Sequence, residues 1–306
     1  MTNLPARPDA ATASPEREPH QWLGLIFIVP SFVLIGIFFL LPLLMTVWMS
    51  FYNWPLLGKI NFIGLDNYVE LAGDQQLWRS IGFTLLYTVL VTTALFVVAF
   101  PLALLVDKPL KAAGVFRTIY FMPVVIGFGA ASTLWNWLLN PDSGVFARLL
   151  LSLHLVDAAP RPLENFWPAI GVVILMVVWK SAGFSMVILL TGLQSVPNDL
   201  MEAAKIDGAG AWSRFRRITL PLMRNSILLV LVLNVTSSML AFDQFFIITQ
   251  GGPQNSTISA VFSIFLASLT SYRLGYGSAL SLVLLVVLVA ISSIQLAFLR
   301  TRSEES

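Results

Sequence analysis

The chain has 306 residues, of which 57% are hydrophobic and only 11% are charged, with a net charge of +2 and a mean hydropathy of +0.81. Soluble globular chains carry about 25% charged residues, so this composition excludes an ordinary water-soluble protein and predicts a chain whose main solvent is lipid. Cysteine is absent, which excludes disulfides and cysteine-based metal sites.

Six apolar runs are long enough to cross a bilayer as helices, which takes about 20 residues. They cover residues 22–48, 81–106, 119–139, 166–190, 227–248 and 276–299. Each run is apolar on every side, whereas the strands of a membrane barrel alternate with a period of two. The sequence therefore predicts an all-α integral membrane protein with six transmembrane helices over residues 22–300, preceded by a disordered tail at 1–21 and followed by a short tail at 301–306.

The first run is too long for the apolar core of a cleaved signal peptide, and no A-x-A-like site ends it, so we expect a retained helix. Prolines interrupt the first three runs at Pro30, Pro42, Pro101 and Pro123. Two interpretations remain open for them: kinks that neighbouring helices tolerate, or bends that open a cavity between helices.

Basic residues concentrate in one set of connections. They lie in the N-terminal tail, after the second run, between the fourth and fifth runs, and in the C-terminal tail: Arg7, Arg17, Lys108, Lys111, Arg117, Lys205, Arg214, Arg216, Arg217, Arg224, Arg300 and Arg302. The other connections hold fewer: Lys59, Arg79, Arg148, Arg161 and Arg273. Because basic residues favour the cytoplasmic side, both termini and the segment 195–222 are predicted to be cytoplasmic.

The most charged part of the chain is the stretch EAAKIDGAGAWSRFRRITLP at 202–221. Pro197 and Asp199 suit the start of a helix, Gly208 and Gly210 predict a turn, and a second short helix is expected over 211–218, ended by Pro221. One interpretation is a basic loop that touches lipid headgroups. The other is a docking element for a cytoplasmic partner, because the paired alanines allow close approach.

This stretch resembles the EAA motif of the membrane subunits of ABC importers, the permeases that receive solute from a binding protein. The motif has E-A-A, three residues, G, nine residues, I, one residue and L-P, and every fixed position is present. The matching residues are Glu202, Ala203, Ala204, Gly208, Ile218, Leu220 and Pro221, and Asp207 lies among them. The resemblance implies that 195–222 forms a coupling helix seated in a cleft of an ATPase subunit.

Other stretches resemble the sugar-permease branch, which includes the larger maltose permease subunit and glycerol-3-phosphate permeases. They include FIGLDNYVEL, FRTIYFMPVVI, VVWKSAGFSM and ITQGGPQNST, so the resemblance covers nearly the whole chain. It implies the type I ABC importer permease fold in a bacterial or archaeal cell membrane. It also implies four partners: a second, similar permease, two ATPase subunits that bind ATP and Mg, and an extracytoplasmic solute-binding protein.

The chain lacks the sequence patterns of an enzyme. There is no GxxxxGK[ST] phosphate loop, no HExxH metal motif and no G-x-S-x-G nucleophile elbow. We therefore expect no catalytic residue, no metal site, no bound cofactor and no nucleic-acid partner in this chain, and we expect its energy source to be external.

A few polar residues fall inside the predicted spans: Lys180 in the fourth, and Asn234, Ser238, Asp243 and Gln244 in the fifth. Such residues are costly in lipid and often mark a solute path. Three interpretations remain open for the two charged residues: Lys180 and Asp243 pair with one another, Lys180 reaches a backbone carbonyl, or both face a translocation cavity. The polar face of the fifth span suits either a hydrated path for a polyhydroxy solute or hydrogen bonds between helices.

Three functions follow from these patterns. The motif favours an ABC importer permease for a carbohydrate or a related polar solute, with glycerol-3-phosphate or glycerophosphodiesters as the alternative cargo. A secondary transporter driven by an ion gradient through Lys180 and Asp243 is the second hypothesis, although no internal repeat is evident. A scaffold whose basic loop recruits a cytoplasmic protein is the third.

Overall fold

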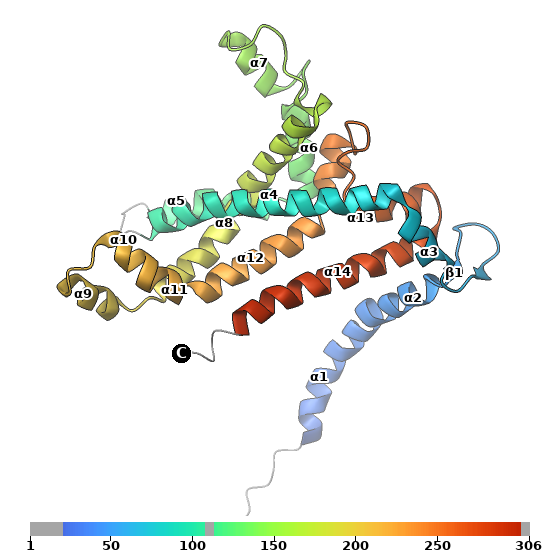
Figure 1. Ribbon diagram of the computed structural model, residues 1–306, viewed down its shortest axis with the longest axis horizontal. Coiled ribbons are helices and arrows are strands. Elements are labelled where there is room, and N and C mark those ends of the chain that lie inside the picture. Colours follow the sequence, from blue (N-terminus) through green and yellow to red (C-terminus); the bar gives the residue numbers. More distant parts are fainter. Residues whose placement is uncertain (1–20, 108–112, 301–306) are drawn as a thin grey trace, which may run out of the picture. The chain divides into compact units, whose positions relative to one another are not determined.

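The computed structural model describes residues 21–107 and 113–300. The predicted tails at 1–20 and 301–306 and the basic residues Lys108 and Lys111 lie outside the described residues. The chain divides into two units, 1–46 and 47–306, which are described separately. Figure 1 shows the chain as helices joined by short connections.

The first unit holds the first predicted span. Its elements are α1 (Gln21–Ile35), the π-helical turn η1 (Gly36–Leu40) and the start of α2 (Leu41–Met49). Pro30 lies inside α1 and Pro42 inside α2, so neither proline ends the helix. Proline lacks an N–H and crowds the preceding turn, and the wider π turn directly before Pro42 relieves that crowding.

Three spans of the second unit are continuous helices close to their predicted limits. They are α4 (Gln75–Val106), α8 (Phe166–Gln194) and α14 (Leu274–Arg300). A fourth helix, α12 (Arg224–Met239), packs against all three and lies between α4 and α14 in Figure 1. Ala99 and Ala103 of α4 are fully buried, and small residues at this spacing let membrane helices approach closely.

The third predicted span is bent, so the expectation of one helix over 119–139 is wrong. It consists of α5 (Ala113–Phe121), the 3-10 turn η2 (Met122–Val125) and α6 (Phe128–Leu138), and its two arms meet at 94°. Pro123 cannot donate a backbone hydrogen bond, and Gly127 has an extended backbone before α6. Pro123 therefore marks a break, whereas the helices continue through Pro30, Pro42 and Pro101.

The fifth predicted span is also interrupted, which corrects the expectation of one helix over 227–248. Helix α12 ends at Met239, and the π-helical turn η5 (Phe245–Thr249) follows after a short irregular stretch. Four helices in the described residues are long and apolar enough to cross a membrane, or up to six if each bent pair counts as one span.

The connections opposite the charged segment carry small elements. They are the antiparallel strands β1 (Tyr52–Asn53) and β2 (Asn61–Phe62), α3 (Asp66–Gly73), α7 (Val145–Ser152), the 3-10 turn η3 (Pro162–Glu164), α13 (Ala260–Phe265) and the π turn η6 (Leu266–Thr270). Figure 1 shows α3 and the strands at one end of the second unit, and α9 and α10 at the other.

Side-chain contacts hold the strands and α3 to the start of α14. The Asn67 amide donates to the carbonyls of Ser50 (2.7 Å) and Tyr52 (3.0 Å). Arg273 donates through both guanidinium nitrogens to the two Glu70 carboxylate oxygens, at 2.7 and 2.5 Å. These hydrogen bonds hold the pKa of Glu70 below its ordinary value and raise the pKa of Arg273.

Candidate functional site: the charged elbow and the polar residues of the spans

The charged segment forms an ordered elbow, defined here as residues 197–222. Its first helix, α9 (Asn198–Ile206), begins after Pro197 and carries Asp199 in its first turn. The helix ends at Ile206, and Gly208, two residues further on, has a φ of +75° that an L side chain rarely adopts. The Ala209 N–H bonds the Ala204 carbonyl and the Gly208 N–H bonds the Lys205 carbonyl, which is the Schellman pattern that glycine favours.

The second half of the elbow is longer than predicted. It consists of α10 (Ala211–Arg214), the π turn η4 (Phe215–Thr219) and α11 (Leu220–Leu222). Pro221 lies within α11 and does not end the helix; the chain bends by 65° at Met223, directly before α12. The π turn before Pro221 repeats the arrangement seen before Pro42.

Contacts fix the elbow to itself and to the bundle. The Arg214 guanidinium donates to the Ala209 carbonyl at 2.7 Å, across the glycine turn. The Phe215 ring packs against Trp212 at 5.6 Å and against Phe100 near the end of α4 at 5.8 Å, between ring centroids. The elbow is therefore anchored at its second half, so that α9 is held away from the bundle.

Most of the motif residues are exposed. Ala204 and Ile218 are half-buried, whereas the others are exposed: Glu202, Ala203, Asp207, Gly208, Leu220 and Pro221. Ile206, at 86%, and Trp212, at 71%, are the most exposed of the large apolar side chains in the elbow. An exposed mixture of apolar and charged side chains on an ordered frame suits docking to a protein.

Lys180 does not pair with Asp243, so that part of the expectation is wrong. Its ammonium donates to the Val124 carbonyl at 3.4 Å and lies 4.2 Å from the centre of the Phe128 ring. A lysine at the centre of a membrane helix costs about 2.5–3.5 kcal/mol, and a desolvated cation–π contact returns about 2 kcal/mol. The protein itself therefore supplies partners for this buried cation.

Asn234 and Ser238 lie on the same buried face of α12. The Ser185 hydroxyl donates to Asn234 Oδ1 at 3.2 Å, and the Ser238 hydroxyl donates to the Asn234 carbonyl at 2.6 Å. Asn234 Nδ2 is buried and has no partner within the described chain. The two N–H groups of this amide therefore have no hydrogen-bond acceptor among the described residues.

Asp243 and Gln244 are helical and lead directly into η5, after the break in the fifth predicted span at 240–242. Gln244 is buried and donates to the Tyr87 hydroxyl of α4 at 3.2 Å, and Asp243 is half-buried. The structure thus places Gln244 between α4 and the broken fifth span. It does not bring Lys180 and Asp243 together as an ion pair in the described residues.

Two polar features were missed by the sequence interpretation. Asn136 of α6 donates to the Ile247 carbonyl of η5 at 2.7 Å, which ties the two broken spans together. Buried hydroxyls on one face of α4 recur every four residues: Ser80, Thr84, Thr88 and Thr92. That spacing is visible in the sequence, whereas the Asn136 contact depends on two bends that the sequence did not reveal.

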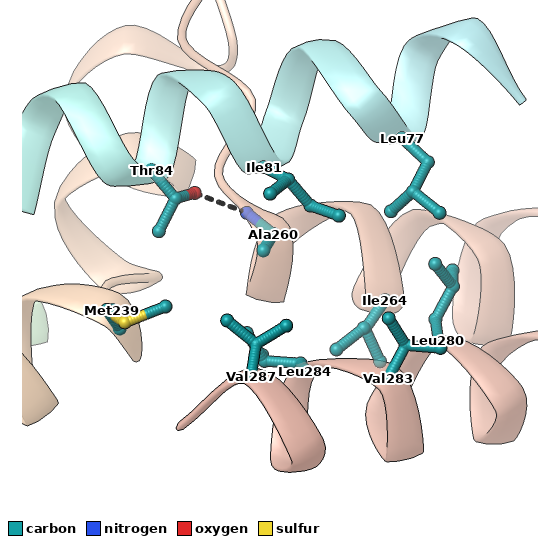
Figure 2. Close-up of a pocket in the computed structure, with 10 residues that line it drawn as sticks. All are labelled: Leu77, Ile81, Thr84, Met239, Ala260, Ile264, Leu280, Val283, Leu284 and Val287. Atoms are coloured by element: carbon teal, nitrogen blue, oxygen red, sulfur yellow. Dashed lines mark hydrogen bonds between the residues drawn. The ribbon is translucent and has the colours of Figure 1, made fainter. Parts of the chain in front are cut away.

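A small cavity lies between α4, α13, α14 and the end of α12, and Figure 2 shows its lining. Thr84 is its one polar side chain, and its hydroxyl accepts a hydrogen bond from the Ala260 N–H at 2.9 Å. The volume open to a water centre is about 10 Å³, the lower limit for a single water. The cavity is a packing gap and holds no polar solute.

Comparison with known proteins places this architecture in a family. Residues 20–303 match the binding-protein-dependent transport system inner membrane component family. The trehalose/maltose transport system permease protein MalF of Thermococcus litoralis is 30% identical over 92% of this chain and 95% of its own. The sn-glycerol-3-phosphate transport system permease protein UgpA of Yersinia enterocolitica is also 30% identical, over 92% of this chain and 95% of its own.

The fold matches a solved structure as well. A chain of the bacterial alginate ABC transporter, crystallised with an alginate pentasaccharide-bound periplasmic protein, superposes with a TM-score of 0.80. It is 24% identical and the match covers 92% of this chain and 95% of that one. The chain therefore has the type I importer permease fold, and it is a member of the binding-protein-dependent transport system inner membrane component family.

Proposed function

We propose that this chain is the membrane-spanning permease subunit of an ATP-driven ABC importer, and that it translocates a carbohydrate or a related polar solute delivered by an extracytoplasmic binding protein. The observation that carries the proposal is the elbow. The E-A-A residues lie on the exposed helix α9, which ends in the glycine turn at Gly208. The second half of the elbow is anchored to the end of α4 through Phe215.

The partners follow from the same proposal. A second, similar permease would complete the translocation path, two ATPase subunits would bind ATP and Mg, and the binding protein would dock at the opposite face. The chain itself would bind no cofactor. It would lie in a bacterial or archaeal cell membrane with both termini and the elbow in the cytoplasm, because most basic residues lie on that side.

The elbow would transmit the movement of the ATPase subunits to the membrane helices. The ATPase subunits close on ATP and α9 moves with them as a rigid body. The Arg214 contact joins α9 to the second half of the elbow, the Phe215 ring passes the motion to the end of α4, and α11 leads it along the chain into α12. The cavity between the two permeases then opens outward, and hydrolysis resets it. This is alternating access driven by a change of state at the cytoplasmic face.

The solute path would follow the polar side of the fifth span. Asn234 offers two unpaired N–H groups, Ser238 lies one turn away, and Asp243 and Gln244 lie directly after the break in the helix. Hydroxyl-rich solutes suit such donors and acceptors. The MalF and UgpA relatives favour sugars and sn-glycerol 3-phosphate as the two classes to test.

The test uses the complete importer in proteoliposomes with Glu202→Ala and Gly208→Pro. We expect each variant to lose about tenfold or more of ATP-driven uptake and of binding-protein-stimulated ATP hydrolysis, which corresponds to about 1.4 kcal/mol of coupling. Glu164→Ala is the matched control, because Glu164 is exposed, is paired only with Arg161 at the surface and lies at the opposite face. Intact uptake and hydrolysis in both elbow variants would refute the proposal.

The ion-gradient hypothesis gives the opposite result in the same vesicles. Uptake that collapses with a protonophore while ATP persists would favour a secondary transporter. Uptake that persists with the protonophore and stops when ATP is removed supports the importer. Trehalose, maltose and sn-glycerol 3-phosphate are the solutes to test first, each presented with the cognate binding protein.

A further inference from the structure

Lys180 is a buried cation whose surroundings differ from those expected of a solute ligand. Its side chain belongs to α8 and is 6% exposed. The structure gives it two contacts, the Val124 carbonyl and the Phe128 ring, and both belong to the bent third span. Lys180 of α8 therefore contacts the bend of another membrane span.

The two contacts lie on opposite sides of the bend. Val124 belongs to η2, the end of the first arm, and Phe128 is the first residue of α6, the second arm. A break in a membrane helix frees backbone carbonyls that lipid cannot satisfy. The ammonium reaches such a carbonyl at the C-terminal end of the first arm, where the helix dipole favours a positive charge.

Gly183 brings the same face of α8 against the first arm. It lies three residues after Lys180, so the two residues share one side of the helix. A Cβ at Gly183 would collide with the Tyr120 carbonyl, which shows that the backbones of α8 and α5 are in direct contact there. Gly183 thus fixes the first arm against α8, and Lys180 holds the point where the second arm departs.

The angle between the two arms of the third span affects the position of the interrupted fifth span. The second arm carries Asn136, whose amide donates to the Ile247 carbonyl at 2.7 Å. Ile247 lies in η5, in the helical segment that begins with Asp243 and Gln244 after the break at 240–242. A change of the angle between the two arms would therefore move the interrupted part of the fifth span.

We propose that Lys180 is a positioning residue that fixes the angle between the two arms of the third span by contacting both, and that it does not bind solute. This role of Lys180 depends neither on whether ATP drives import nor on which solute is carried. It makes a prediction about the solute-free protein, whereas a solute ligand would affect only the loaded state.

The experiment measures the bend directly with two spin labels. The native chain has no cysteine, so Val115→Cys on the first arm and Trp137→Cys on the second give unique attachment sites, and both positions are exposed. The distance between the labels is measured by double electron–electron resonance in the full chain in lipid nanodiscs, with any subunits that copurify and without solute or nucleotide. Lys180→Met, Lys180→Arg and Phe128→Leu are compared on this background.

Lys180→Met should shift and broaden the distance distribution, because neither the carbonyl nor the ring retains its cation. Lys180→Arg should restore a narrow distribution near the native distance. Lys205→Met is the control: it makes the same chemical change on exposed α9 and should leave the distribution unaltered. An unchanged distribution in Lys180→Met would overturn the assignment.

Phe128→Leu keeps the experiment decisive if Lys180→Met does not accumulate in the membrane. It leaves the lysine in place and removes only the ring beneath the ammonium, so it should broaden the distribution to a smaller degree. A native distribution in Phe128→Leu, when Lys180→Met cannot be measured, would count against the role of this contact. Because no solute is present, these outcomes are independent of whether the proposed import function is correct.

Discussion

At the residue scale, single backbone and side-chain details decide whether the elbow has a fixed shape. Gly208 adopts a φ of +75°, and its turn is closed by the Ala209 and Gly208 backbone N–H groups and by the Arg214 guanidinium. The glycine turn was predictable, because glycine after a helix ending in Lys205 and Asp207 is a common stop signal. The Arg214 contact was not, since arginine in a cytoplasmic loop is equally explained by topology.

ATP-driven uptake by Gly208 variants should decrease as the energetic cost of a left-handed backbone at position 208 increases. An L residue there costs about 1–2 kcal/mol, and asparagine tolerates this conformation better than alanine or valine. We therefore expect ATP-driven uptake to fall in the order Gly208, Gly208→Asn, Gly208→Ala and Gly208→Val. Equal uptake in the asparagine and valine variants would contradict a role for the turn geometry. Gly73→Ala, in the opposite connection with open space around it, is the control.

Asn234 should affect solute affinity more than folding. Its Nδ2 is buried without a partner, so a solute would gain hydrogen bonds worth about 0.5–1.5 kcal/mol. We expect Asn234→Ala to raise the half-saturating concentration of solute about three- to tenfold. Ser185→Ala removes the hydroxyl that donates to Asn234 Oδ1 but leaves the amide in place, and should have the smaller effect. The reverse order would indicate that Asn234 serves only helix packing.

At the element scale, long apolar runs were predictable and the breaks within them were not. The predicted limits of α4, α8 and α14 lie within a few residues of the observed ones because hydropathy alone sets the length of a span. A bend was one of the two interpretations left open for every proline, but the sequence could not single out Pro123, since Pro30, Pro42 and Pro101 are equally conspicuous and lie inside continuing helices. What distinguishes Pro123 is tertiary: the extended Gly127, the close approach at Gly183 and the cation of Lys180.

The tie between α3 and the start of α14 should weaken in acid. The hydrogen bonds from Arg273 lower the pKa of Glu70 from its ordinary value of 4.5. The stabilisation is therefore fully present above that ordinary value and is lost as the pH falls through the lowered one. Both side chains are about half exposed, so the effect is small. On acidification, the thermal unfolding temperature of the reconstituted Glu70→Gln variant should fall slightly less than that of the native protein. An equal fall in the two proteins would contradict the prediction.

At the scale of the whole molecule, the fold class and the membrane character follow from composition, and the family follows from one spaced motif. The six apolar runs and the residues of the EAA pattern are visible in the sequence without a structure. The arrangement of the solute path did need one, because it depends on where the broken spans meet. Asn136 joins the two breaks, yet nothing in its sequence context separates it from its neighbours Trp135 and Trp137.

We propose that the exposed side of α9 docks on an ATPase subunit, and photo-cross-linking in the native membrane can show whether it does. A photoreactive amino acid replaces Ile206, which is 86% exposed on the elbow, or Leu153, which is 58% exposed in the connection predicted to lie outside. After illumination of the native membrane, we expect the label at position 206, and not the one at 153, to cross-link to a nucleotide-binding subunit. A cross-link from position 206 to lipid alone, or to a subunit that binds no ATP, would contradict the account.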